Sequence, residues 1–298
     1  MTGAVQATER GAEGYLMGLL GHGVTASLTP ALHRLEADRQ GLRYVYRPVE
    51  MPAQAPTGDA LKGLLDSARV LGFDALNVTH PLKRAVVAHL DELEPATRRL
   101  NAVNTVLIQD GRLVGHNTDL TGFTTAVREH LTADPLGHVL VVGAGGAGSA
   151  VAEAAAGLGA SPLVVVDAED RRAQDLAADL SARHPGVDVR PASYADLPDA
   201  LRDADGIVHC TPTGMAHHPG VPFDVDLLEP SQWVADIVYR PLETELLVRA
   251  RERGCQVLHG GYMAVYQASH TFTLVTGRVP DHRLMLGDLD ELVARSAP

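Results

Sequence analysis

The chain alternates between two kinds of hydrophobic pattern. Short runs of apolar, often β-branched residues are typical of buried strands, whereas longer segments repeat apolar residues every three or four positions, as amphipathic helices do. In the N-terminal part this pattern predicts strands at 15–21, 43–50 and 73–80, separated by helices at 29–41 and 58–72. Alternating strands and helices of this length favour a mainly parallel sheet.

A β-hairpin is predicted at 101–119, because the dipeptide Asp110-Gly111 between two strand-like segments is a favoured two-residue turn. A helical segment at 120–131 and a polar stretch at 132–137 lead into a second α/β series. The strands expected there, with helices between them, lie at 138–143, 162–167, 187–192, 206–211 and 233–239. The last expected helices lie at 243–254 and 262–277.

Composition and charge exclude several classes of function. A chain of 298 residues is long enough for two domains. Its net charge of -12 argues against nucleic acid or an anionic membrane surface as a partner, and an anionic substrate would need local donors. No apolar run approaches the ~20 residues of a bilayer span. Residues 1–14 have no signal-peptide pattern and predict a frayed tail, so we expect a cytoplasmic protein.

Cysteine and histidine spacing gives no sign of a metal site. Cys210 and Cys255 each lie in or beside an apolar run, which is typical of reduced core residues. The histidines near polar loops have no ligand spacing, and such isolated histidines are more often loop or interface residues. They are His22, His80, His116, His217 and His218.

The clearest motif is a glycine-rich loop, Gly143-x-Gly145-x-x-Gly148, placed directly after an apolar strand and at the start of a helix of small residues. In such loops the first glycine allows a tight turn and the second lets the backbone approach a pyrophosphate. The third allows close packing of helix on strand, and the helix N-terminus offers free N–H groups. The sequence therefore predicts a dinucleotide site.

An acid follows at the distance expected for ribose recognition. Asp167 ends the next strand, 19 residues after Gly148. A carboxylate there accepts hydrogen bonds from the ribose 2′- and 3′-hydroxyls and repels a 2′-phosphate, which favours NAD over NADP. Arg171 and Arg172 leave two interpretations open: contact with a phosphate or the adenine, or an ordinary solvated first helical turn.

Four polar segments follow or precede strands in the N-terminal half, and ligands of open α/β sheets bind beyond the carboxyl ends of strands. Their hydroxyls, amides, amine and carboxylate suit a small polyhydroxy acid, although each segment alone could serve as a cap or turn. The segments are Ser27–Pro30, Asn77–Lys83, Asn101–Thr105 and Gly115–Asp119.

These motifs together resemble the shikimate dehydrogenase family over nearly the whole chain, from Gly18 to about Gly277. The matching motifs, in order, are NVTHPLK, NAVNTV, GHNTD, VVGAGGAGSAV, TPTGM, DIVYRPLETELL and GGYMAVYQA. The resemblance implies a substrate-binding and catalytic α/β domain at 1–119, joined by the returning helices 265–298. It also implies a Rossmann-type dinucleotide-binding domain at 120–264 and reversible hydride transfer between a nicotinamide and a ring carbon.

The resemblance also implies roles for individual positions. Lys83 and Asp119 match the catalytic pair. The substrate-binding positions are matched by Ser27, Thr29, Thr79, Asn104, Tyr239 and Gln267. The cofactor-lining positions are matched by Gly143, Ala144, Gly145, Gly146, Ala147, Thr211, Ile237 and Gly260, and Arg172 aligns with an arginine near the adenosine ribose. Lys83 can take the alcohol proton, and burial and the charge of Asp119 act on its protonation in opposite directions.

Two departures from the usual family motifs indicate which members of the family this chain resembles most. Biosynthetic members usually carry Ser-x-Ser where this chain has Ser27-Leu28-Thr29, beside the position where quinate bears a hydroxyl that shikimate lacks. NADP-dependent members typically carry Asn-Arg-Thr where this chain has Asp167-Ala168-Glu169. We therefore expect NAD-dependent oxidation of quinate, shikimate or both to the 3-dehydro acids at the ring C3 hydroxyl, the direction of breakdown rather than of aromatic biosynthesis.

Other interpretations stay open at this stage. One is an NAD-dependent enzyme for aminoshikimate or aminoquinate. Another is a biosynthetic NADP-dependent shikimate dehydrogenase, which Asp167 opposes. A third is a catalytically silent NAD sensor, which the presence of both Lys83 and Asp119 disfavours. A homodimer is left open, since the sequence does not determine the oligomeric state.

Overall fold

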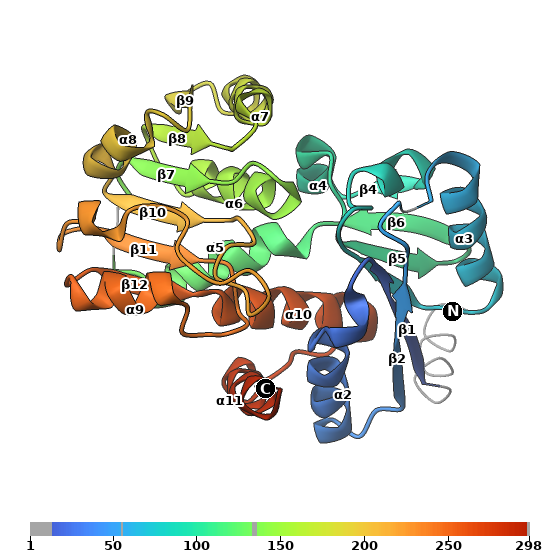
Figure 1. Ribbon diagram of the computed structural model, residues 1–298. Coiled ribbons are helices and arrows are strands. Elements are labelled where there is room, and N and C mark those ends of the chain that lie inside the picture. The colour runs from blue at the N-terminus through green and yellow to red at the C-terminus, as the bar shows by residue number, and fades with distance from the viewer. Residues whose placement is uncertain (1–13, 55, 133–135, 297–298) are drawn as a thin grey trace. The chain divides into compact units, whose positions relative to one another are not determined.

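Two compact units make up the chain in a computed structural model that describes residues 14–54, 56–132 and 136–296. The first unit extends to Thr118 and includes Ala268–Leu292, and the second contains Asp119–Gln267 and the residues after Leu292. Each unit contains one six-stranded sheet (Figure 1). The expected frayed tail and the centre of the polar stretch at 132–137 lie outside the described residues.

The first unit has a mixed sheet of order β2-β1-β3-β5-β6-β4. Its strands are β1 (Tyr15–Gly21), β2 (Tyr44–Glu50), β3 (Ala75–Val78), β4 (Glu92–Leu93), β5 (Thr105–Gln109) and β6 (Arg112–His116). β1 pairs in parallel with β2 and β3, while β5 is antiparallel to β3 and β6. The parallel part is the predicted strand–helix alternation, and the antiparallel part is the predicted hairpin.

The hairpin turn has the geometry that its sequence predicts. Gln109 is paired with Arg112, which leaves a two-residue loop. Asp110 and Gly111 both have positive φ angles, 51° and 75°. A type I′ turn requires this combination and matches the twist of the flanking strands. The hairpin expected at 101–119 is therefore confirmed.

Helices cover both faces of this sheet. They are α2 (Thr29–Arg39), α3 (Gly58–Val70), α4 (Pro95–Leu100), the C-terminal part of α10 (Gly260–Thr276) and most of α11 (His282–Arg295), with short 3-10 turns at Val24–Ala26 and Ala85–His89. On one face Leu61 and Leu65 of α3 pack on Leu76 and Val78. On the other, Met17 and its neighbours pack against Leu274 and Val275 near the end of α10.

The second unit has a fully parallel sheet of order β12-β11-β10-β7-β8-β9. The strands are β7 (Val139–Val142), β8 (Leu163–Val166), β9 (Val189–Ala192), β10 (Gly206–His209), β11 (Trp233–Asp236) and β12 (Gln256–His259). The helices are α5 (Thr118–His130), α6 (Gly146–Gly157), α7 (Asp170–Arg183), α8 (Leu197–Asp203), α9 (Glu245–Glu252) and the start of α10, with a 3-10 turn at Val225–Leu227. The chain order reverses between β7 and β10, which is the doubly wound dinucleotide-binding topology.

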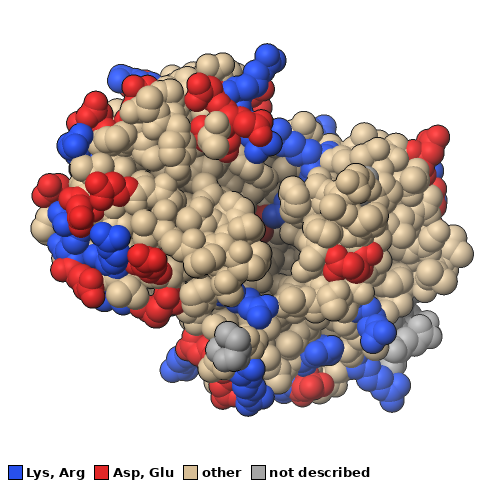
Figure 2. Space-filling model, in the orientation of Figure 1, with Lys and Arg blue, Asp and Glu red and all other residues tan. Residues whose placement is uncertain are grey.

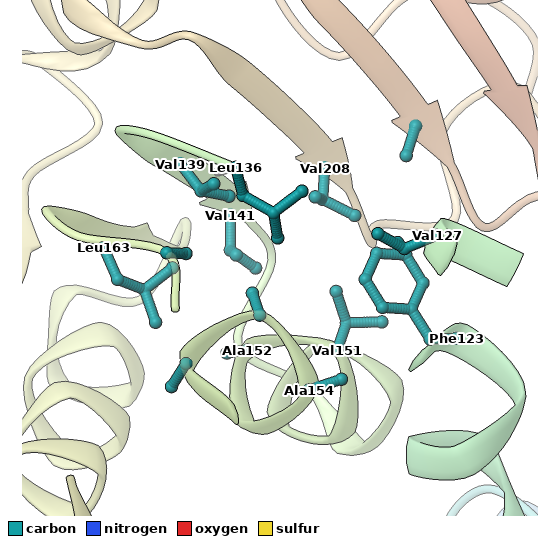
Figure 3. Packing of buried hydrophobic residues seen from close by; sticks show 14 of the residues in the cluster. Phe123, Val127, Leu136, Val139, Val141, Val151, Ala152, Ala154, Leu163 and Val208 are labelled. Carbon is teal, nitrogen blue, oxygen red and sulfur yellow. The ribbon is translucent and has the colours of Figure 1, made fainter. Parts of the chain in front are cut away.

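Alternate side chains of these buried strands enter two separate cores. Val139 and Val141 of β7 face α5 and α6, whereas Leu140 and Val142 face α8 and α9. Figure 3 shows the first core, where Phe123 of α5 lies close to Val151 of α6. Burial on both faces explains why these strands are continuous apolar runs rather than alternating ones. The α/β fold class inferred from the sequence is confirmed.

The hydrophobic pattern alone does not predict four elements, β4, α4, β12 and α11, although the returning helices that the family resemblance implies at 265–298 include the range of α11. Strand β4 has only two residues, too few to show a period, and β12 begins with Gln256 and ends with His259, so it forms no apolar run. Helix α11 follows Gly277 and Pro280, which are stop signals, and it buries few side chains, chiefly Met285 and Leu289. Arg39 of α2 pairs with Asp288 of α11 at 2.7 Å, a contact that no local pattern reveals.

Phe123→Ala should lower the free energy of unfolding of the second unit by about 3 kcal/mol, because it leaves a cavity in a closely packed core. Denaturant titration monitored by circular dichroism measures this change. Val248→Ala on α9 is the control, since that side chain is 37% exposed and its loss should cost less than about 0.5 kcal/mol. Equal effects of the two changes would contradict the packing described here.

Candidate functional site

Polar segments meet at one edge of the first unit's sheet. The ends of β1, β3 and β6 and the start of β5 lie at this edge, as the register of the strands requires. Thr79 donates its N–H to Leu20 O at 2.9 Å, and Val78 donates to Asn104 O at 2.7 Å. The edge thus brings together the segments that contain Thr79 and Asn104, two predicted substrate-binding residues.

The loop after β1 presents the predicted hydroxyls of Ser27 and Thr29, both half-buried. Thr29 donates its N–H to Ser27 Oγ at 3.3 Å. The N-cap of α2 is Leu28, which has no side-chain acceptor, so neither hydroxyl residue occupies the N-cap itself. Helix capping therefore explains only part of the Ser-x-Thr pattern: Ser27 accepts a hydrogen bond from the first helical residue, but neither hydroxyl is at the N-cap.

Glu50, at the end of β2, fixes this loop and was not singled out from the sequence. Its carboxylate accepts hydrogen bonds from Gly23 N–H at 2.5 Å, from Thr25 N–H at 3.0 Å and from the Thr25 hydroxyl at 2.8 Å. The Thr25 hydroxyl and the Gly23 amide hold the pKa of Glu50 below its usual range, because they stabilise the ionised form. The contact joins residues 25 or more positions apart, so no local motif indicates it.

Behind the edge lies a buried network of amides and hydroxyls, which we call the amide–hydroxyl network: Tyr46, Asn77, Asn104, Thr105, Thr118 and Thr271. Tyr46 donates to Asn77 Oδ1 at 2.5 Å, and Asn77 donates to Thr105 Oγ1 at 2.9 Å. Asn104 Nδ2 donates to Thr118 Oγ1 at 2.9 Å, and Thr118 N–H donates to Asn104 Oδ1 at 2.7 Å. Asn104 therefore orients the residue that directly precedes Asp119.

The predicted catalytic pair is divided between the units. Lys83 lies half-buried in the turn after β3, where its carbonyl accepts a hydrogen bond from Val103 N–H at 2.8 Å. Asp119 lies in the first turn of α5 and is 7% exposed. Two predicted substrate-binding residues, Tyr239 and Gln267, also belong to the second unit. There Gln267 donates to Ala264 O within α10 at 3.0 Å.

In the second unit the glycine loop has the geometry that its motif predicts. Gly143 has a φ of 109°, and its N–H donates to Val166 O at 2.7 Å. A side chain at Gly148 would collide with the carbonyl of Gly143, so this glycine permits the helix to lie against the strand end. Gly145 is the N-cap of α6, and a Cβ there would contact nothing within 4 Å. Among the described residues, therefore, no contact requires glycine at that position.

Asp167 joins this loop directly. Its Oδ2 accepts a hydrogen bond from Ala144 N–H at 2.7 Å, and its Oδ1 accepts one from Glu169 N–H at 2.9 Å. The carboxylate is thus fixed at the carboxyl end of β8, beside the first turn of the glycine loop. Each oxygen has a second lone pair, which leaves acceptor capacity for further donors.

The two arginines that follow are paired with acids on their own helix. Arg172 pairs with Glu169 at 2.7 Å, and Arg171 pairs with Asp175 at 3.5 Å. All four side chains are more than half exposed, so these ion pairs contribute little to stability. The structure thus shows the ordinary helical-turn arrangement for both arginines.

The remaining predicted cofactor-lining residues lie at the same edge of the second sheet. Thr211 follows β10, and a Cβ at Gly143 would lie 3.1 Å from its Cγ2. Gly260 begins α10 directly after β12, and a side chain there would collide with the carbonyl of Ile237 after β11. The ends of β7, β8, β10, β11 and β12 therefore contribute the predicted dinucleotide positions.

Cys210 and Cys255 are free thiols, and burial raises the pKa of each. Burial also lowers the pKa of His116. No group of three histidine, cysteine or acidic side chains in the described ranges is placed to hold a metal ion. None of the described helices has both the length and the apolar character needed to cross a membrane.

Charged side chains at the surface are mixed in sign. Near α9, Arg251 pairs with Glu243 at 2.6 Å and Arg249 with Asp226 at 3.3 Å. Figure 2 shows basic and acidic side chains side by side over this region. Over this region, therefore, the described side chains form no extended basic face that would suit a polyanion.

The fold and these two edges define a class of protein. A doubly wound parallel sheet with this glycine loop is typical of dinucleotide-dependent oxidoreductases, and the first unit adds a separate sheet edge rich in hydroxyls and amides. The family model "Shikimate dehydrogenase substrate binding domain" matches residues 19–106.

Similarity to known proteins extends over nearly the whole chain. A relative from Pseudarthrobacter chlorophenolicus, "Shikimate dehydrogenase (NADP(+))", is 53% identical over 95% of this chain and 96% of its own. A relative from Corynebacterium efficiens, "Quinate/shikimate dehydrogenase (NAD(+))", is 44% identical over 89% and 94%. The solved "Quinate dehydrogenase from Corynebacterium glutamicum in complex with NAD" matches with a TM-score of 0.87 and 43% identity over 93% of this chain and 99% of that one. The chain belongs to the shikimate dehydrogenase family, which confirms the resemblance inferred from its motifs.

Glu50→Gln should loosen the loop that contains Ser27 and Thr29, because a neutral amide accepts these hydrogen bonds more weakly than a carboxylate does. Hydrogen exchange followed by mass spectrometry on peptides covering Gly21–Thr29 should show faster exchange in the variant at neutral pH, after correction for intrinsic rates.

The wild-type protein should lose the same protection as pH falls. The folded pKa of Glu50 is depressed, so its contribution is present above the unfolded pKa and is lost as the pH falls through the lower folded value, below about 4.5. Equal protection in wild type and variant at every pH would contradict the anchoring contact.

Proposed function

We propose that this protein is an NAD-dependent dehydrogenase that reversibly oxidises quinate, shikimate or both at the ring C3 hydroxyl. Family membership supports the reaction, and the relatives' names supply quinate and shikimate as substrates and nicotinamide dinucleotides as cofactors. The single observation that favours NAD is Asp167, an acid held beside the glycine loop where a cofactor ribose would lie.

The fixed carboxylate of Asp167 favours NAD on electrostatic grounds. Its remaining lone pairs suit the two hydroxyls of an unmodified ribose. Two unit charges about 5 Å apart repel by about 3 kcal/mol at an effective dielectric constant of about 20, which is enough to disfavour a 2′-phosphate. In the structure Arg172 pairs with Glu169 and not with Asp167, so in this arrangement it does not offset the charge of Asp167.

The relatives favour different cofactors. The 53% identical relative is named for NADP, and the relative at 44% is named for NAD. Whole-chain identity averages over hundreds of positions, whereas discrimination at the ribose depends on a few side chains. We therefore give more weight to Asp167-Ala168-Glu169, and an NADP-dependent shikimate dehydrogenase is the competing function that the NADP relatives favour.

On the substrate side we propose that the first unit binds the polyhydroxy acid. Ser27 and Thr29 would bind its carboxylate, and Thr79 and Asn104 would bind ring hydroxyls from the same sheet edge. Tyr239 and Gln267 of the second unit would complete the set. The loop held by Glu50 and the amide–hydroxyl network support this assignment, because they hold these groups in fixed positions before a ligand arrives.

A bound nicotinamide dinucleotide supplies the hydride acceptor. We propose that Gly143–Ala147, Thr211, Ile237 and Gly260 line its site and that Arg172 lies near its adenosine ribose. Lys83 would accept the proton that leaves the substrate hydroxyl and return it in the reverse reaction. Asp119 would hold the substrate hydroxyl and Lys83 in a productive orientation. Asp119 is buried, and it directly follows Thr118, which the amide–hydroxyl network holds in place.

Initial rates with quinate and with shikimate, each with NAD and with NADP, test this proposal. Activity with NAD should exceed that with NADP for both acids, because only NADP brings a phosphate to Asp167. Higher activity with NADP would refute the cofactor assignment, and turnover of aminoshikimate alone would refute the substrate assignment.

Replacing Asp167-Ala168-Glu169 by Asn-Arg-Thr should raise the ratio of kcat/KM for NADP to that for NAD by about tenfold or more, because it removes two acids and adds a guanidinium. Overall cofactor affinity should fall, because asparagine has one side-chain oxygen and can accept only one of the two backbone N–H hydrogen bonds that the Asp167 carboxylate accepts. The control Arg171→Gln should leave the ratio within about twofold, since that side chain is exposed. An unchanged ratio in the triple variant would contradict the role of Asp167.

Lys83→Ala should reduce kcat by about a hundredfold or more, as expected for loss of a general acid–base, while the Kd of NAD changes little. Arg84→Ala is the matched control, because it removes a neighbouring, exposed positive charge. Near-normal kcat in the Lys83 variant would exclude this residue as the proton acceptor.

A further inference from the structure

A buried hydrogen-bonded chain lies behind Thr211 in the second unit. His209 Nε2 lies 2.5 Å from Thr211 Oγ1, and His209 Nδ1 lies 3.0 Å from Asp236 Oδ1. Thr244 donates its hydroxyl to Asp236 Oδ2 at 2.7 Å. His209 and Asp236 are register partners at the ends of β10 and β11, and His209, Asp236 and Thr244 are at most 1% exposed.

The donors around Asp236 determine where the protons lie. Its carboxylate faces Val238 N–H at 3.0 Å, the Thr244 hydroxyl and His209 Nδ1. A carboxylate is an acceptor only, so His209 must place its proton on Nδ1. In the neutral imidazole Nε2 is then an acceptor, and the Thr211 hydroxyl donates to it.

With His209 in its neutral form, this arrangement makes the Thr211 hydroxyl a donor to His209. Its proton is directed to His209, and Thr213 N–H approaches its Oγ1 at 3.3 Å. The hydroxyl therefore has only acceptor capacity left for a ligand. Without His209 the hydroxyl could rotate and present either its proton or a lone pair.

Thr211 lies where a dinucleotide of this fold binds. It follows the carboxyl end of β10, the strand beside β7, and its methyl group approaches Gly143 of the glycine loop. Ligands of doubly wound sheets bind at this point, where the strand order reverses. Dinucleotides carry amide N–H and ribose O–H donors that an acceptor here can bind.

We propose that His209 is a positioning residue for the cofactor: held by Asp236, it fixes the Thr211 hydroxyl as an acceptor for an N–H or O–H donor of the bound dinucleotide. The inference rests on the proposed dinucleotide site, but it holds for NAD and NADP alike. His209 itself touches no ligand, and it acts by removing the alternative orientation of one hydroxyl.

Two substitutions at His209 separate its contact with Asp236 from its contact with Thr211. In His209→Asn the shorter amide can still donate to Asp236 but cannot reach Thr211. In His209→Gln the longer amide can still offer an acceptor to Thr211 but no longer matches Asp236. Thr211→Val removes the hydroxyl at nearly constant volume, and Thr244→Val removes a donor to Asp236 while leaving the His209–Thr211 contact in place.

The dissociation constant of the dinucleotide, measured by fluorescence titration with NAD and with NADP on the full-length chain, is the readout. Thr211→Val and His209→Asn should each weaken binding about fivefold, the size of one neutral hydrogen bond, and the double variant should be no weaker than either. His209→Gln should weaken binding less than His209→Asn does, because its amide oxygen can still accept from Thr211 although no contact with Asp236 fixes the amide. Thr244→Val should lower Tm without changing the dissociation constant.

The outcomes that overturn the proposal are distinct. Wild-type affinity in His209→Asn or in Thr211→Val, or losses that multiply in the double variant, would show that the two residues do not act together. If His209→Asn fails to fold, Thr211→Val and His209→Gln still test the proposal: a loss in His209→Gln larger than that in Thr211→Val overturns it. A wild-type protein that binds neither dinucleotide would refute the proposed function, whereas tighter NADP binding would refute only the cofactor preference.

Discussion

The hydrogen bond from Ala144 N–H to the carboxylate of Asp167 is the contact on which the account of the cofactor site depends. It links the turn after β7 to the end of β8, so one carboxylate both shapes the glycine loop and presents charge beside it. The second oxygen is held by Glu169 N–H, at the start of α7. Because both oxygens are held, the position of the charge is set by the sheet and not by a mobile side chain.

The two units share one structural feature but carry different chemical groups on it. In each, strands end at a common edge and residues distant in sequence meet there. The second unit places one acid beside a helix N-terminus, which suits a ligand whose ribose is uncharged. The first unit places hydroxyls and amides, fixed by Glu50 and by the amide–hydroxyl network, which suits a small acid rich in hydroxyls. Neither edge depends on the overall charge of the protein.

Local features could be predicted from the sequence, and long-range ones could not. The Asp110-Gly111 turn and the glycine loop followed by Asp167 depend on residues close in the chain, and the structure has both. Thr271 is hydrogen-bonded to Asn77 across 194 residues, and His209 meets Asp236 only because β10 and β11 pair. The hydrophobic pattern misses helix α11 because that helix buries few side chains, and it misses strand β12 because polar residues at both ends of the strand leave no apolar run.

The most direct measurement is the pair of dissociation constants for NAD and NADP, obtained by isothermal titration calorimetry on the wild-type protein at low and moderate salt. The account predicts that NAD binds about tenfold or more tightly than NADP, with the difference shrinking as salt screens the charge of Asp167. NADP binding as tightly as NAD, or more tightly, would contradict it.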